Sequence, residues 1–134
     1  MTEKNLFNYM KEEHFPDLVM SRGKMSRWDC YSPEYRYRLE LKCRRKHYDT
    51  LLLERSKFEA MVKECRRHSD VPLYVNSTPK GIYAFDLSLI EPEWTTKKLP
   101  ATTQWGGSWV DKEVTMLCIK EAKVLKIFPK SFDI

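Results

Sequence analysis

The residues best suited to chemistry lie in one segment, 35–44, where apolar and charged side chains alternate strictly. This period of two is typical of a half-buried β-strand that has one face in a core and the other in water. The water-facing side would carry five charged residues in a row: Arg36, Arg38, Glu40, Lys42 and Arg44. A carboxylate two residues from a lysine, among arginines, can hold a cation beside a bound phosphate.

Asp29 supplies a second carboxylate if a short turn leads from its segment into this strand. A four-residue loop would set Asp29 directly opposite Glu40, and a two-residue loop would set it opposite Arg38 and diagonal to Glu40. Either loop leaves Asp29, Glu40 and Lys42 on one face, because side chains alternate with period two. A loop of odd length would separate them.

Two carboxylates that lie this close repel each other unless a cation sits between them. Mg²⁺ or Mn²⁺ prefers such oxygen ligands, and the backbone carbonyl of Leu41 could add another. A metal-bound water is easier to deprotonate, and Lys42 could orient that water or stabilise charge on the phosphate. These parts suffice for metal-assisted phosphodiester hydrolysis. The competing interpretation is a solvated strand face on which Glu40 pairs with Arg38 or Lys42.

The pattern of the rest of the chain predicts the elements that would position these residues. Thr2 can cap a first helix that ends near His14, and apolar residues recur at helical spacing between His47 and Arg67. Part of the leucine run 51–53 could instead be a short strand. Strands are expected at 28–32, 35–44, 73–76, 81–86, 114–119 and 124–128, with an irregular loop at about 91–109. The strands at 73–76 and 81–86 are expected to form a hairpin through residues 77–80. We therefore expect one α+β (α/β) domain over residues 1–134, built around a mixed sheet.

Composition narrows the class of protein and of partner. The 134 residues carry a net charge of +5 with a pI near 9.0, which favours an anionic partner. The four cysteines form no C-x-x-C pair, so a zinc ribbon or redox motif is not expected. No apolar run suggests a signal peptide or a membrane span. We expect an intracellular, cytoplasmic protein, located in the host cytoplasm if it is encoded by a phage.

The arrangement resembles the PD-(D/E)XK nuclease superfamily, which includes restriction-type endonucleases and Holliday-junction resolvases. Asp29 matches the family's acid and Glu40-Leu41-Lys42 its E-x-K tripeptide, while 48–67 and 71–76 match the following helix and later strand. The similarity covers roughly residues 3–86, judged by element order. Trp28 stands where the family often has proline. The resemblance implies a restriction-endonuclease-like core whose mixed sheet is flanked by helices.

The family often adds a glutamate from its first helix to the metal site. Glu3 fits by position, and Glu12 and Glu13 are the alternatives near the end of that helix. Lys57 resembles an auxiliary basic residue of related nucleases. Residues that could contact nucleic-acid phosphates gather around the hairpin and on this helix: Arg22, Lys24, Arg27, Arg36, Arg38, Arg44, Arg45, Lys46 and Lys57.

The leading hypothesis is a DNA endonuclease that depends on Mg²⁺ or Mn²⁺ and acts through Asp29, Glu40 and Lys42. Its small size suits a homodimer that acts on branched or nicked DNA, or a phage enzyme of DNA processing. The sequence does not distinguish DNA cleavage from RNA cleavage by the same chemistry. The alternative is a non-catalytic module that binds nucleic acid or protein and retains the nuclease fold.

Overall fold

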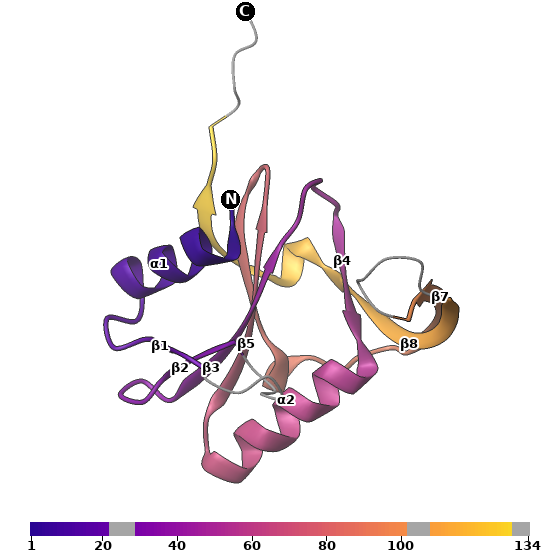
Figure 1. Cartoon of the computed structure of the whole chain (residues 1–134), viewed down its shortest axis with the longest axis horizontal. Helices are drawn as coiled ribbons and strands as arrows, with labels where there is room; N and C mark the ends of the chain where they lie inside the picture. The colour runs from indigo at the N-terminus through magenta and orange to yellow at the C-terminus, as the bar shows by residue number, and fades with distance from the viewer. Residues whose placement is uncertain (22–28, 102–107, 130–134) are drawn as a thin grey trace, which may run out of the picture.

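The computed structural model describes residues 1–21, 29–101 and 108–129. A six-stranded sheet has the order β1-β2-β3-β5-β6-β9, and a three-stranded sheet has the order β4-β8-β7 (Figure 1). The elements are α1 (Glu3–Glu13), β1 (Val19–Met20), β2 (Cys30–Ser32), β3 (Tyr37–Cys43), β4 (Thr50–Glu54), α2 (Arg55–His68), β5 (Val71–Thr78), β6 (Gly81–Asp86), β7 (Thr95–Pro100), β8 (Trp109–Cys118) and β9 (Lys123–Ile127). Strands β3 and β5 pair in parallel and the other pairs are antiparallel, which confirms the predicted mixed α+β fold.

Helix α1 forms where the sequence predicts it and covers one face of the six-stranded sheet. The Thr2 side chain caps the helix by accepting a hydrogen bond from the amide of Asn5 at 3.1 Å. Leu6 and Met10 are buried in a cluster that includes Leu39 and Leu41 of β3. Apolar burial on this side therefore fixes α1 against the strand that carries the E-x-K residues.

The second helix begins later than predicted, because the leucine run forms a strand. Leu51 and Leu53 are fully buried while Leu52 is only partly buried, as expected for a strand with alternating faces. Strand β4 pairs with β8, and α2 starts at Arg55 rather than at His47. Pairing with a distant segment decided between the two alternatives for this run, and local spacing could not.

The prediction that the charged face of β3 lies in water is wrong for its middle residues. Arg38 and Glu40 retain only 7% and 6% of their accessible surface. Strand β3 lies inside the sheet between β2 and β5, and α2 packs against the neighbouring strand β5. An interior strand of this kind is covered on both faces, so its alternating charges mark a buried polar site rather than a solvated surface.

The predicted irregular loop at 91–109 is wrong for residues 95–100, which form β7 and pair with β8. This strand is exposed on both faces, so its residues carry no apolar alternation that would reveal it. Residues 102–107 lie outside the described residues. Trp94, just before β7, packs edge-on against Phe58 of α2 with ring centroids 5.5 Å apart.

The expected hairpin of β5 and β6 is present, with β6 at its predicted bounds, β5 longer at both ends and a two-residue turn at Pro79-Lys80. Gly81 lies where β6 meets the closing strand β9. A Cβ atom on Gly81 would lie 2.3 Å from the carbonyl oxygen of Lys126, so only glycine fits there without a shift of the backbone. Neither described helix is long and apolar enough to cross a membrane.

Candidate active site

The turn between β2 and β3 sets the register that brings the two predicted carboxylates together. Ser32 pairs with Tyr37 and Cys30 with Leu39, where the paired register ends, so Asp29 comes just before the paired residues of β2. The amide of Asp29 donates to the carbonyl of Leu39 at 2.8 Å, which holds Asp29 against β3 beside Glu40. Of the two registers consistent with the sequence, the four-residue loop is the one that forms.

The carboxylates of Asp29 and Glu40 lie within hydrogen-bonding reach of each other. Asp29 Oδ2 also accepts a hydrogen bond from the backbone amide of Leu41 at 2.7 Å, which orients its side chain. Burial raises the pKa of Glu40 to about 6, the negative charge of Asp29 adds to the shift, and Lys57 opposes it. The pair is a concentrated negative site that favours a proton or a metal cation.

Lys57, in the first turn of α2, supplies a cation to this pair. Its Nζ atom lies 2.5 Å from Glu40 Oε1. Burial lowers the pKa of Lys57, but the hydrogen bond and the charge of Glu40 outweigh burial, so the net shift is upward. The auxiliary lysine suggested by the family resemblance therefore contacts the metal-ligand candidate directly.

Glu3 lies at the same end of the molecule as the carboxylate pair. Burial and the charge of Asp29 raise the pKa of Glu3, whereas Lys57 and Lys42 lower it. The alternatives Glu12 and Glu13 belong to the last turn of α1. There the negative charge of Glu13 contributes to the pKa values of Tyr9 and His14. Of the three glutamates, Glu3 is the one that interacts electrostatically with Asp29, Lys57 and Lys42. Its role as a metal ligand stays a prediction.

A cleft of about 340 Å³ opens beside the pair. It is lined by residues from both sheets and from α2: Glu40, Lys42, Arg44, Leu52, Leu53, Glu54, Lys57, Tyr74, Ala101 and Lys112. Lys42 is exposed and shares the cleft with Glu40, as expected from their spacing on β3. Glu40 and Lys42 therefore share one cleft, in which Lys42 is exposed and Glu40 is buried, while Asp29 lies beside Glu40 and is not among the lining residues.

Arg44 has a structural role in the wall of this cleft. Its guanidinium donates to the Asn76 side chain at 3.1 Å, to the Leu52 carbonyl at 2.8 Å and to the Tyr74 hydroxyl at 2.9 Å. These contacts join β3 to β4 and β5. Tyr74, which the sequence did not single out, pairs in register with Glu40 across the parallel strands.

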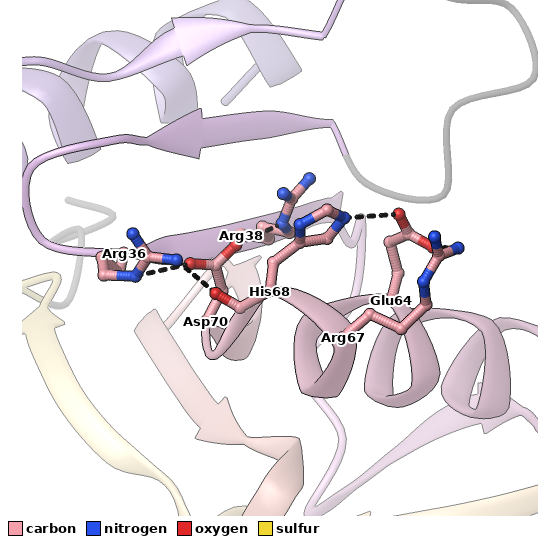
Figure 2. A network of polar contacts seen from close by, with 6 residues as sticks. All are labelled: Arg36, Arg38, Glu64, Arg67, His68 and Asp70. Atoms are coloured by element: carbon pink, nitrogen blue, oxygen red, sulfur yellow. Dashed lines mark hydrogen bonds and ion pairs between the residues drawn. The ribbon is translucent and has the colours of Figure 1, made fainter.

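Arg36 and Arg38 converge on a buried aspartate rather than on the cleft (Figure 2). Arg38 Nε lies 2.7 Å from Asp70 Oδ2, and Arg36 Nε lies 3.2 Å from Asp70 Oδ1. Arg36 also donates to the carbonyl of His68, the last residue of α2. The Arg38 side chain is only 9% exposed, which argues against its predicted contact with nucleic acid.

The other predicted phosphate contacts fall into two groups. Arg45 and Lys46 are exposed just after β3, and Arg45 lines a second cavity that it shares with Arg44. Arg22, Lys24 and Arg27 lie outside the described residues. Lys112 and Glu54 were missed because they reach the cleft through the small sheet, whose strand pairing has no local sequence signal.

The side chains that could bind a metal ion are few in the described part of the chain. Among residues 1–21, 29–101 and 108–129, no group of three His, Cys, Asp or Glu side chains is close enough to hold a metal ion. Asp29 and Glu40 alone can supply two carboxylates. A small hard cation that keeps several waters, such as Mg²⁺, fits such an incomplete oxygen site better than Zn²⁺ does.

Comparison with solved structures identifies the fold. The chain is similar to the Holliday junction resolvase Hjc of Archaeoglobus fulgidus, an archaeal hyperthermophile, with a TM-score of 0.59 and 13% identity. The match covers 92% of this chain and 88% of the resolvase. No family model and no curated protein matches the sequence. The structural likeness shows a restriction-endonuclease-like fold, as the sequence resemblance implied.

Proposed function

We propose that this protein is a metal-dependent endonuclease that hydrolyses phosphodiester bonds in branched DNA. The proposal rests on Glu40 and Lys42, which line one cleft, and on Asp29, which lies beside Glu40, in a fold shared with a Holliday junction resolvase. The fold alone would leave the chemistry open, because unrelated functions share folds. The carboxylate pair and the adjacent lysine supply the chemical argument.

Asp29 and Glu40 would hold Mg²⁺ or Mn²⁺ through their carboxylates, with the carbonyl of Leu41 as a further oxygen donor. The amide of Leu41 already points to Asp29, and in a strand the carbonyl of the same residue points to the same side. Glu3 is the first-helix carboxylate best placed to bind a water of the ion. The raised pKa of Glu40, caused by burial and then by the charge of Asp29, supports this role, because a bound divalent cation would stabilise both carboxylates in their charged forms.

The bound ion would supply charge neutralisation at the phosphate and a water that is easier to deprotonate. Two lysines of the chain, Lys42 and Lys57, would supply the remaining positive charges. Lys42, exposed in the cleft, is placed to hold a phosphate oxygen or the attacking water. Lys57 neutralises Glu40 when no ion is bound and can turn toward the phosphate when an ion takes that place.

The DNA backbone would follow the basic residues near the end of β3. Arg45 and Lys46 are exposed and can contact phosphates, while Arg44 mainly fixes the cleft wall. Arg38 is not part of this surface, because Asp70 holds it in the interior. A homodimer would present two such sites, which suits a substrate with two equivalent strands. RNA as a substrate and a phage origin stay predictions.

One observation favours a second candidate, a non-catalytic module that binds nucleic acid through the same fold. Lys57 already occupies a cation position beside Glu40, and the described residues contain no group of three metal-binding side chains. This candidate predicts DNA binding without cleavage and little effect of Glu40→Gln on that binding.

A cleavage assay separates the two candidates. The wild-type protein is incubated with supercoiled DNA, single-stranded DNA, a four-way junction and a matched RNA, with Mg²⁺, with Mn²⁺ and with a chelator. We expect metal-dependent cutting of the junction that is lost in Lys42→Ala and Glu40→Ala but retained in Lys63→Ala, an exposed lysine of α2. Cutting that persists in Lys42→Ala or Glu40→Ala would exclude the proposed site, and binding without any cutting would favour the module.

A further inference from the structure

One wall of the cleft belongs to the small sheet β4-β8-β7 rather than to the nuclease core. Lys112 of β8 and Glu54 of β4 line the same cleft as Glu40 and Lys42. Lys112 Nζ lies 3.2 Å from Glu54 Oε1, so the two residues hold each other at this wall. The face of β8 that carries Lys112 is therefore the cleft face of the small sheet.

The strand register places a second lysine on this face. Lys97 of β7 is directly opposite Lys112 in the antiparallel pair, so both side chains project to the same side. Lys97 Nζ lies 3.8 Å from the sulfur of Met116, which belongs to the same face of β8. Like charges directly opposite each other destabilise a strand pair, and Glu54 balances only one of the two.

The opposite face of the same two strands shows the usual arrangement. There Lys98 stands opposite Asp111, and Glu113 lies 2.5 Å from Arg55 of α2. Charge matching is thus kept on the face away from the cleft and broken on the face toward it. A strand pair that tolerates two opposed lysines beside a cationic cleft is suited to an anion that passes between them.

We propose that Lys97 and Lys112 form a second phosphate-binding wall of the cleft, which holds the DNA backbone on the side opposite Lys42. The inference rests on the proposed function, because its ligand is the DNA that the endonuclease would cut. It assigns substrate binding to the small sheet, whereas the carboxylates belong to the six-stranded sheet. Glu54 sets the position of Lys112 and leaves one positive charge for the phosphate.

The test measures binding of a fluorescently labelled four-way DNA junction in chelator, where no cleavage occurs, over a range of salt concentrations. Each lost phosphate contact lowers the slope of log affinity against log salt by about 0.9. We expect the double variant Lys97→Ala, Lys112→Ala to bind more weakly, with a slope smaller by about 1 to 2. Lys98→Ala, on the opposite face of β7, is the matched control and should bind like wild type.

A charge reversal separates ligand binding from folding. Lys97→Glu places a carboxylate opposite Lys112, so we expect the midpoint of thermal unfolding to stay equal or rise while DNA affinity falls. If Lys97 had a purely structural role, the midpoint of thermal unfolding and the DNA affinity would change in the same direction. An unchanged affinity and salt slope in Lys97→Glu and in the double variant would overturn the proposal.

The outcome also distinguishes this inference from the proposed function. Metal-dependent cleavage that needs Glu40, together with unaltered binding in both lysine variants, would remove the second wall and leave the endonuclease standing. Loss of binding in the lysine variants of a protein that cuts nothing would support the wall and exclude the enzyme. Absence of any DNA binding by the wild-type protein would overturn both.

Discussion

At the scale of single residues, the proposed chemistry depends on the burial of one glutamate, Glu40. Glu40 is buried, faces Asp29 across the hairpin and is only partly neutralised by Lys57. Proximity of like charges in a poorly hydrated place is costly, and it is a recurrent feature of functional sites. The strain in this pair is the reason we assign it a cation.

This confinement predicts a pH-dependent stability without metal. The pKa of Glu40 is about 6 in the folded protein against 4.5 ordinarily, so the folded state binds the proton more tightly. The resulting stabilisation is fully present below pH 4.5 and is lost as pH rises through 6, a loss of about 2 kcal/mol. Glu40→Gln should therefore gain stability relative to wild type between pH 4.5 and 7, measured by denaturant unfolding in chelator. A constant difference between the two proteins over that range would contradict this assignment.

Lys57 has the opposite influence on the same carboxylate. Its ammonium group lowers the pKa of Glu40, so Lys57→Met should raise that pKa further. Because a metal must displace the proton from Glu40, the midpoint of Mn²⁺ binding against pH should move to higher pH in this variant. The exposed Lys63→Met, also on α2, serves as the control and should leave the midpoint in place. A midpoint that stays in place in Lys57→Met would show that Lys57 does not lower the pKa of Glu40.

At the scale of elements, the buried Asp70 ties the end of α2 to the turn before β3. Arg36 has a backbone φ of 61°, in the left-handed region, and its amide and carbonyl bond to Ser32 and Val71. Its side chain reaches both Asp70 and the last carbonyl of α2 (Figure 2). The turn that sets the position of Asp29 is thereby coupled to the helix that carries Lys57.

Removal of the Asp70 carboxylate should lower the free energy of unfolding. Asp70→Ala leaves the guanidinium of Arg38 in the interior without the carboxylate that lies 2.7 Å away. Loss of one partner of a buried ion pair typically costs about 3–5 kcal/mol. Asp111→Ala, an exposed aspartate on β8, should change stability by less than about 0.5 kcal/mol. Chemical denaturation of both variants measures the two changes, and similar small values for both would show that the Asp70 cluster contributes little.

The sequence predicted the elements whose signal is local. The strict alternation at 35–44, the Thr2 cap and the hairpin after α2 all correspond to observed elements. Where a segment depends on a distant partner, prediction failed, as for β4 and for the exposed strand β7. Alternation also could not tell a buried charged face from a wet one, so the buried ion pair of Arg38 was missed.

At the scale of the whole molecule, the proposed site is assembled from four separate parts of the chain. The start of α1 brings Glu3, the segment before β2 brings Asp29, β3 brings Glu40 and Lys42, and the first turn of α2 brings Lys57. Leu52, Leu53, Glu54 and Lys112 of the small sheet also line the cleft. Local spacing explains Glu40 and Lys42, whereas the other members depend on register and packing that the fold supplies.

The most direct test of the central claim is calorimetric titration of the folded protein with Mn²⁺ at pH 8, compared between wild type and single variants. We predict one binding site that weakens by more than about tenfold in both Asp29→Asn and Glu40→Gln, since each removes a carboxylate ligand. Glu12→Gln, at the far end of α1, should bind like wild type. Equal Mn²⁺ affinity in wild type, Asp29→Asn and Glu40→Gln would contradict the claim that these two carboxylates form a metal site.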